Sequence, residues 1–107
     1  MEIREREHLI ELFGYYKNLL TDKQRNYFEE YYLYDCSLAE IAENHNVSRN
    51  ACFDALKKTE DLLNEYESKL GLYNKFNKLS ETLNLNDLNK IKDIIKNIVE
   101  EWFYGIW

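Results

Sequence analysis

Residues 35–56 read DCSLAEIAENHNVSRNACFDAL, and this stretch decides the fold. Ser37 has the hydroxyl of a helix N-cap, and Glu40 three residues later completes a capping box, so a helix should begin after Ser37. Its apolar side chains recur at helical spacing and would share one face: Leu38, Ile41 and Ala42. The stretch therefore begins with a short amphipathic helix.

A second helix follows a tight turn. His45 and Asn46 make the turn, Val47 is its apolar plug, and Ser48 caps the next helix. The side chains expected on the inward face of this second helix are Ala51, Cys52, Ala55 and Leu56. This order of caps, apolar faces and turn is typical of a helix-turn-helix. The chain has no proline and three glycines, and the predicted fold class is all-α.

The chain before the motif also follows helical patterns. Apolar residues recur at three- and four-residue steps over 3–20, which predicts a first helix. Thr21 and Gln24 form another capping box, so the second helix should begin at Asp22. This helix carries an aromatic strip: Tyr27, Phe28, Tyr31 and Tyr32. We interpret the strip as core, with a partner surface as the alternative, because both environments are rich in aromatic side chains.

The helix launched by the motif continues well beyond it. Its apolar stripe runs to Gly71, a typical C-terminal cap, so 49–70 is predicted to be one helix of roughly 33 Å. That length exceeds what three short helices would cover, and the tail is expected to pack on its second half. The tail pattern predicts helices over 72–83 and, after a cap at Asn86, up to Trp102.

The predicted organisation follows from these elements. Residues 1–71 would form a four-helix domain that contains the helix-turn-helix at 37–70. Residues 72–107 would form a helical extension, packed on that domain or on a second subunit. The extension ends in the aromatic run EWFYGIW, which is costly to leave in water.

The length and composition of the chain indicate its domain number and its expected cellular location. A chain of 107 residues suits one domain with a modest core. No apolar run approaches ~18 residues, so we expect no membrane insertion, and the charged N-terminus is unlike a signal peptide. The two cysteines, Cys36 and Cys52, have no disulfide-framework spacing, so the expected location is the cytoplasm.

The sequence offers little for catalysis. Cys36, His45 and Cys52 match no usual zinc spacing, and a buried cysteine commonly acts as a small hydrophobe. No nucleophile has a local His and acid signature, and the three glycines are too far apart for a phosphate loop. We therefore expect no catalytic residues, no metal, no cofactor and no enzyme activity.

DNA binding is the function that a helix-turn-helix first suggests. Ser48, Arg49 and Asn50 begin the outward face of the second helix, where Arg49 could pair with guanine and Asn50 with adenine. Lys57 and Lys58 could meet phosphates. The net charge of −6 argues against this function, because affinity for DNA depends heavily on phosphate neutralisation. Phe53 and Asp54 on the same face weaken it further.

The chain resembles the YlxM family of small bacterial proteins. The matching blocks are LTDKQ at 20–24, SLAEIAE at 37–43, VSRNA at 47–51, KTE at 58–60 and YESKL at 66–70. The resemblance implies a motif like the fourth region of sigma factors, of the winged-helix-like DNA-binding class. This chain departs from the family pattern at His45, Asn46, Cys52 and Phe53. Asn46 stands where a glycine is usual, and asparagine tolerates the left-handed conformation.

Two functions remain open at this point. The resemblance implies a regulatory role in the signal recognition particle pathway, with the targeting GTPase or its receptor as partner. The alternative is a DNA-binding transcriptional regulator. We expect a homodimer, and the residues predicted for a partner surface are Tyr27, Tyr31, Phe53, Trp102 and Trp107.

Overall fold

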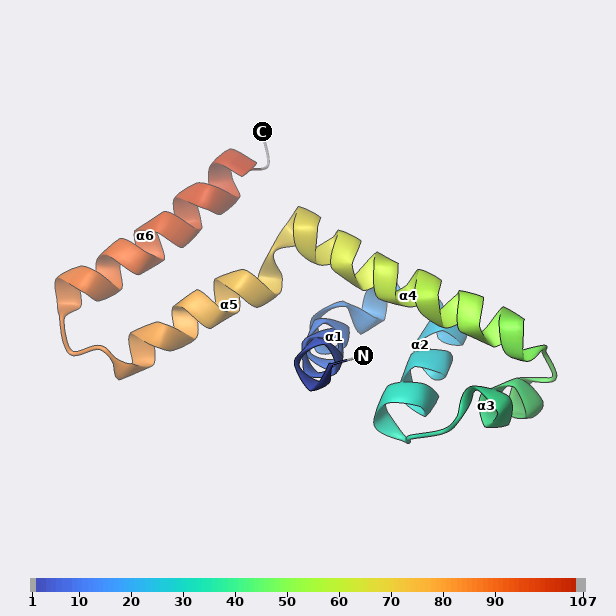
Figure 1. Cartoon of the computed structure of the whole chain (residues 1–107). Coiled ribbons are helices and arrows are strands. Elements are labelled where there is room, and N and C mark those ends of the chain that lie inside the picture. The colour runs from blue at the N-terminus through green and yellow to red at the C-terminus, as the bar shows by residue number, and fades with distance from the viewer. Residues whose placement is uncertain (1, 106–107) are drawn as a thin grey trace. The chain divides into compact units, whose positions relative to one another are not determined.

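The computed structural model describes residues 2–105 of the chain (Figure 1). Within this range every regular element is a helix, as the sequence predicts. The chain divides into two compact units, Met1–Leu70 and Gly71–Trp107. In the part of the chain that is described, no helix combines the length and the apolar character needed to cross a membrane.

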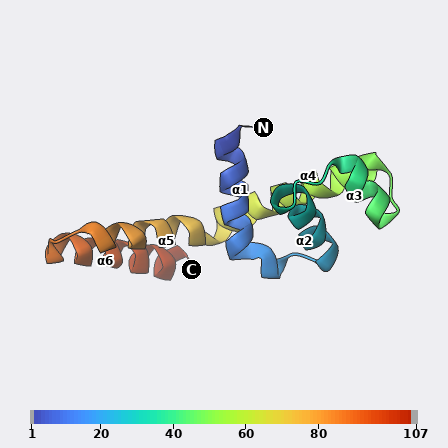
Figure 2. The ribbon, with the colours of Figure 1, turned by 90° about the horizontal axis from the view of Figure 1, so that it is seen from below.

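The first unit is built around one long helix, α4. In Figures 1 and 2 the helices α1, α2 and α3 lie against α4 at successive places along its length, with α3 beside its N-terminal half. The segments of this unit are α1 (Ile3–Tyr16), the 3-10 turn η1 (Lys17–Leu19), α2 (Asp22–Phe28), the π-helical segment η2 (Glu29–Leu33), α3 (Leu38–His45) and α4 (Arg49–Leu70).

Aromatic side chains fill the middle of this unit. The Phe28 ring stacks on Phe13 at a centroid distance of 4.4 Å and on Tyr32 at 4.3 Å. All three side chains are buried, together with Tyr16 and Tyr27. The aromatic strip is therefore core, and burial of such large rings is the main stabilising term available to a small domain.

The helix-turn-helix forms as predicted. Both capping boxes are present, at Thr21 with Gln24 and at Ser37 with Glu40. Asn46 adopts the left-handed conformation with φ 57°, which asparagine tolerates better than most residues. The next residue, Val47, donates its backbone N–H to the Ala42 carbonyl at 3.0 Å, so the turn satisfies the end of α3.

Two local expectations for the first unit need correction. Ala51 is exposed, because it lies off the stripe through which Cys52 and Leu56 reach the core. The α-helix at the N-terminus ends at Tyr16 and continues only as the 3-10 turn. Near the end of α4, Tyr66 packs on Tyr16 and donates its hydroxyl to the Leu19 carbonyl at 3.4 Å, so α1 and η1 cover part of this region.

The π-helical segment η2 was not predicted. It continues α2 without a break, and its wider turn changes the direction of the side chains that follow Phe28. Arg6 of α1 holds its end: the guanidinium donates to the Tyr32 carbonyl at 2.9 Å and lies 5.0 Å from the centre of the Tyr32 ring. The segment thus depends on a residue 26 positions earlier in the chain.

The second unit is a helical hairpin. Helix α5 (Leu72–Glu81) and the 3-10 turn η3 (Thr82–Asn84) lead to α6 (Leu88–Gly105), which packs along α5 (Figure 1). Gly71 has φ 63°, so the glycine predicted to end α4 also starts α5. The cap of α6 is Asp87 and not Asn86, because the Asp87 carboxylate accepts the backbone N–H of Asn89 at 2.9 Å.

Candidate functional site

The outward face of the helix-turn-helix is the first candidate. Ser48 accepts the Ala51 backbone N–H at 3.0 Å and so caps α4, as predicted. Arg49, Asn50 and Phe53 follow it on the first turn and a half of α4, all exposed. The residues predicted to read bases therefore lie in the solvent at the start of the second helix of the motif.

The charges on this face largely cancel. Lys57 forms an i,i+4 ion pair with Asp61 at 3.6 Å. Asp54 is exposed and lies four residues from both Asn50 and Lys58, so it shares their side of the helix. The residues proposed to meet phosphate thus stand beside carboxylates, and the face carries no cluster of positive charge comparable to that of a DNA reader.

The same face carries an apolar depression of about 140 Å³. It is lined by residues of η2, α3 and α4: Tyr31, Tyr32, Leu38, Phe53, Leu56, Lys57 and Glu60. Phe53 is 55% exposed at its rim. Two residues of the predicted partner surface, Tyr31 and Phe53, therefore meet here, beside the Lys57 assigned to DNA. The spacing of residues in the sequence could not predict that Tyr31 and Phe53 lie together, because they belong to different elements, η2 and α4.

The Tyr27 side chain is buried and is not part of the molecular surface. It is 1% exposed and packs with Ile41, Ala42, Cys52 and Leu56. Its ring meets the His45 ring edge-on at a centroid distance of 4.6 Å, and burial raises the pKa of its hydroxyl. Tyr27 lies on the side of α2 that covers the helix-turn-helix, which makes it a core residue and corrects its assignment to the partner surface.

His45 and the cysteines occupy structural positions. His45 Nε2 lies 2.5 Å from Glu30 Oε2, so the histidine joins the motif to η2. Cys52 is fully buried and Cys36 is half-buried; both are free thiols, and burial raises the pKa of each. Across residues 2–105, no three His, Cys, Asp or Glu side chains are arranged to hold a metal ion.

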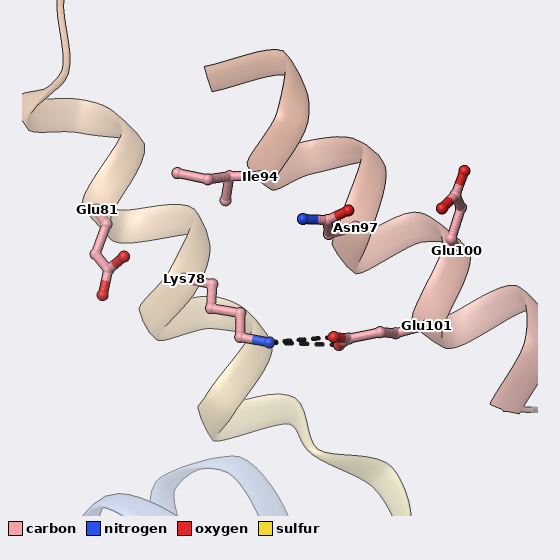
Figure 3. A pocket seen from close by; sticks show the side chains of 6 residues that line it. All are labelled: Lys78, Glu81, Ile94, Asn97, Glu100 and Glu101. Atoms are coloured by element: carbon pink, nitrogen blue, oxygen red, sulfur yellow. Dashed lines mark hydrogen bonds and ion pairs between the residues drawn. The ribbon is translucent and has the colours of Figure 1, made fainter. Parts of the chain in front are cut away.

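The helical hairpin presents different surfaces. Figure 3 shows its polar side, an open hollow of about 530 Å³ between α5 and α6 in which Lys78 bonds to Glu101 at 3.3 Å. Glu81, Ile94, Asn97 and Glu100 complete its lining, so the hollow is a solvated groove of mixed charge. On α6, Trp102 is 49% exposed, and the Lys75 ammonium lies 5.8 Å from its ring centre. Trp107, the last residue predicted for a partner surface, lies outside the described residues.

The capped crossing of α3 and α4 places this chain in the class of helix-turn-helix proteins. Comparison with known proteins gives the family. The family model UPF0122, described as “Putative helix-turn-helix protein, YlxM / p13 like”, matches residues 3–101, and the chain belongs to this family.

Curated relatives agree with the family match. A UPF0122 protein of Staphylococcus haemolyticus is 46% identical over 94 residues, which cover 83% of this chain and 86% of that protein. A UPF0122 protein of Lactococcus lactis subsp. cremoris is 50% identical over 86 residues, or 78% of each chain. A third, from Halalkalibacterium halodurans, is 57% identical over 72 residues, which cover 67% of this chain and 66% of that protein. The resemblance to the YlxM family is thereby confirmed.

Proposed function

We propose that this chain is a regulatory protein of the signal recognition particle pathway and acts by binding a protein, not by catalysis. Its partner would be the targeting GTPase or its receptor, in the cytoplasm. The pathway comes from the resemblance to the YlxM family. The observation that carries the mode of action is the outward face of the motif, where the exposed Phe53 rims an apolar depression among balanced charges.

The charge distribution supports a protein partner. Residues 1–71 carry fifteen acidic and nine basic side chains, so the whole net charge of −6 lies in the helix-turn-helix unit. A surface with this excess repels phosphate and attracts basic proteins. The apolar depression adds the feature that protein interfaces share, an aromatic anchor beside a pocket.

The test is a binding titration of the full-length chain against the purified targeting GTPase and its receptor. We expect binding in the micromolar range or tighter, and a Phe53→Ala variant that binds about tenfold more weakly. Tyr34→Ala is the matched control, because Tyr34 is 67% exposed but does not line the depression. No detectable binding to either protein at micromolar concentration would contradict the proposal.

The DNA-binding alternative is tested in parallel. Arg49 and Asn50 are exposed at the start of α4, as base contacts require. The measurement is a gel-shift titration against the promoter of the chain's own operon at ~50 mM salt, because the attraction between basic side chains and DNA phosphates is strong at low salt. A shift that disappears in an Arg49→Ala, Asn50→Ala double variant would favour this alternative over the first function.

A further inference from the structure

A second hollow adjoins the apolar depression of the first unit. It has a volume of about 320 Å³ and lies between the N-terminal half of α1 and the middle of α4, so we call it the α1–α4 hollow. Its lining is mostly polar or charged: Glu5, His8, Leu9, Lys57, Glu60, Asp61 and Asn64. Lys57 and Glu60 also line the apolar depression, and the two hollows therefore meet along α4.

Helix α4 supplies the line along which the two hollows meet. At about 100° per residue, four of its lining residues fall within an arc of roughly 60°: Phe53, Lys57, Glu60 and Asn64. Phe53 and Glu60 are seven residues apart, which is about 10 Å along the helix at ~1.5 Å per residue. An apolar site and a charged site therefore lie on one face of α4, about two turns apart.

The charge of the α1–α4 hollow is negative. Its charged lining groups at pH 7 are three carboxylates and one ammonium, those of Glu5, Glu60, Asp61 and Lys57. The ammonium pairs with Asp61 at 3.6 Å, and Oε1 of Glu60 accepts the Tyr32 hydroxyl at 2.8 Å. A carboxylate can accept several hydrogen bonds, since each of its two oxygens carries two lone pairs. The hollow thus favours a cationic side chain and disfavours a phosphate or a carboxylate.

The receiving surface indicates the form of the partner segment. The described part of the chain contains no strand, so it offers no sheet edge to which an extended segment could add. A helix laid into a groove presents side chains at spacings of three, four and seven residues. Residues seven apart on such a helix are about 10 Å apart on one face, which is the separation of Phe53 and Glu60.

The two hollows together identify the chemistry of the partner. The apolar depression suits a large apolar side chain, and the α1–α4 hollow suits a basic one. We propose that the first unit binds a basic amphipathic helix of its partner, with an apolar residue in the depression and an Arg or Lys about seven residues away in the α1–α4 hollow. This inference rests on the function proposed above, because it takes the depression as a protein-binding site.

The experiment uses synthetic helices as probes and measures fluorescence anisotropy with the full-length chain at ~50 mM salt. Each probe is an alanine-based helix of about 20 residues, long enough to be helical in water. One face carries two leucines four residues apart, followed by two arginines that continue the same stripe. A second peptide has the reverse order along the chain, and control peptides have glutamate in place of arginine. We expect the chain to bind an arginine peptide and not its glutamate counterpart.

Variants of the chain locate the binding site. Phe53→Ala removes the apolar anchor, and the double variant Glu5→Gln, Asp61→Asn neutralises two carboxylates of the α1–α4 hollow. Each should weaken binding of the arginine peptide about fivefold or more. The matched control is Glu11→Gln, Glu43→Gln, which removes the same charge from two exposed positions outside both hollows. It should keep the affinity within about twofold. Circular dichroism checks that every variant retains its helical content.

Titration of the same variants against the targeting GTPase and its receptor separates this inference from the proposed function. Binding of the arginine peptide at this site without binding to either protein would contradict the proposed function and leave the chemistry of the partner helix in place. No preference for the arginine peptides, including no binding at all, would overturn the inference whatever the targeting proteins do. Equal losses of peptide affinity in the Glu5→Gln, Asp61→Asn and Glu11→Gln, Glu43→Gln variants would also overturn it.

Discussion

Two tyrosines show how the first unit combines an aromatic core with a charged exterior. Tyr16 and Tyr32 bury their rings, while their hydroxyls donate to Glu67 at 2.6 Å and to Glu60 at 2.8 Å. Both carboxylates belong to α4, so each bond ties another element to the long helix. A hydrogen bond to a carboxylate is shorter and stronger than one between neutral groups.

The tyrosine bonds make stability sensitive to alkaline pH. Burial and the bond to Glu60 raise the pKa of Tyr32 above its ordinary value of 10.0. Between pH 10 and the raised pKa, the unfolded chain loses this proton while the native chain keeps it. The stabilisation is therefore complete below pH 10 and declines as the pH rises, by about 1.4 kcal/mol per pH unit for this one group.

Tyr32→Phe provides the measurement. The free energy of unfolding, measured by urea denaturation at several pH values above 10, should fall less steeply with pH in the variant than in the wild type. The difference in slope should correspond to about one proton. The pKa of Tyr27 is also raised, but Tyr27 is present in both proteins, so its effect on the pH dependence of stability is the same in each. Parallel pH profiles for the wild type and Tyr32→Phe would contradict this role for Tyr32.

At the level of elements, the π-helical segment η2 is the least regular part of the first unit. Its end is held by the Arg6 guanidinium, which donates to the Tyr32 carbonyl at 2.9 Å and to Asp35 at 3.0 Å. The carbonyl bond is the more important of the two, because Asp35 is exposed and surface ion pairs contribute little. The guanidinium also lies over the Tyr32 ring.

We predict that Arg6→Ala lowers the free energy of unfolding by about 1.5–3 kcal/mol, the range for a hydrogen bond to a charged group. Arg6→Lys should lose much of this stabilisation, since an ammonium cannot reproduce the planar fork. Arg4→Ala is the control on the same helix: Arg4 is exposed, and we expect a change within ~0.5 kcal/mol. Chemical denaturation measures all three variants. Equal effects at positions 4 and 6 would show that η2 does not need the guanidinium.

At the level of the whole molecule, the two units differ in net charge and in the size of their cores. The first has its own aromatic core and the entire net charge, and the second is a neutral hairpin with exposed apolar residues on α6. The compact first unit ends at Leu70, and Gly71 supplies the left-handed turn that separates the two helices.

A fragment of residues 1–71 tests this division. We expect it to unfold cooperatively, because the buried side chains of the first unit, from Leu9 to Leu63, all remain in it. Circular dichroism during chemical denaturation measures this property. A fragment without cooperative unfolding would mean that the hairpin completes the fold of the first unit.

The sequence by itself determined the local features. Each capping box links residues three positions apart, so Thr21 with Gln24 and Ser37 with Glu40 could be recognised without any tertiary contact. Asn46 and Gly71 were likewise predictable, because a left-handed residue is a property of one backbone position. The ordered blocks of the YlxM family were enough to identify the family.

Only the tertiary structure decided which surfaces exist. It buried Tyr27, exposed Ala51, and brought Tyr31, Leu38 and Phe53 from three elements to one depression. It also revealed the dependence of η2 on Arg6, a residue that the sequence places in a charged run. The physical reason is that a cap is satisfied within one turn of helix, whereas the exposure of a side chain depends on the elements that pack against it.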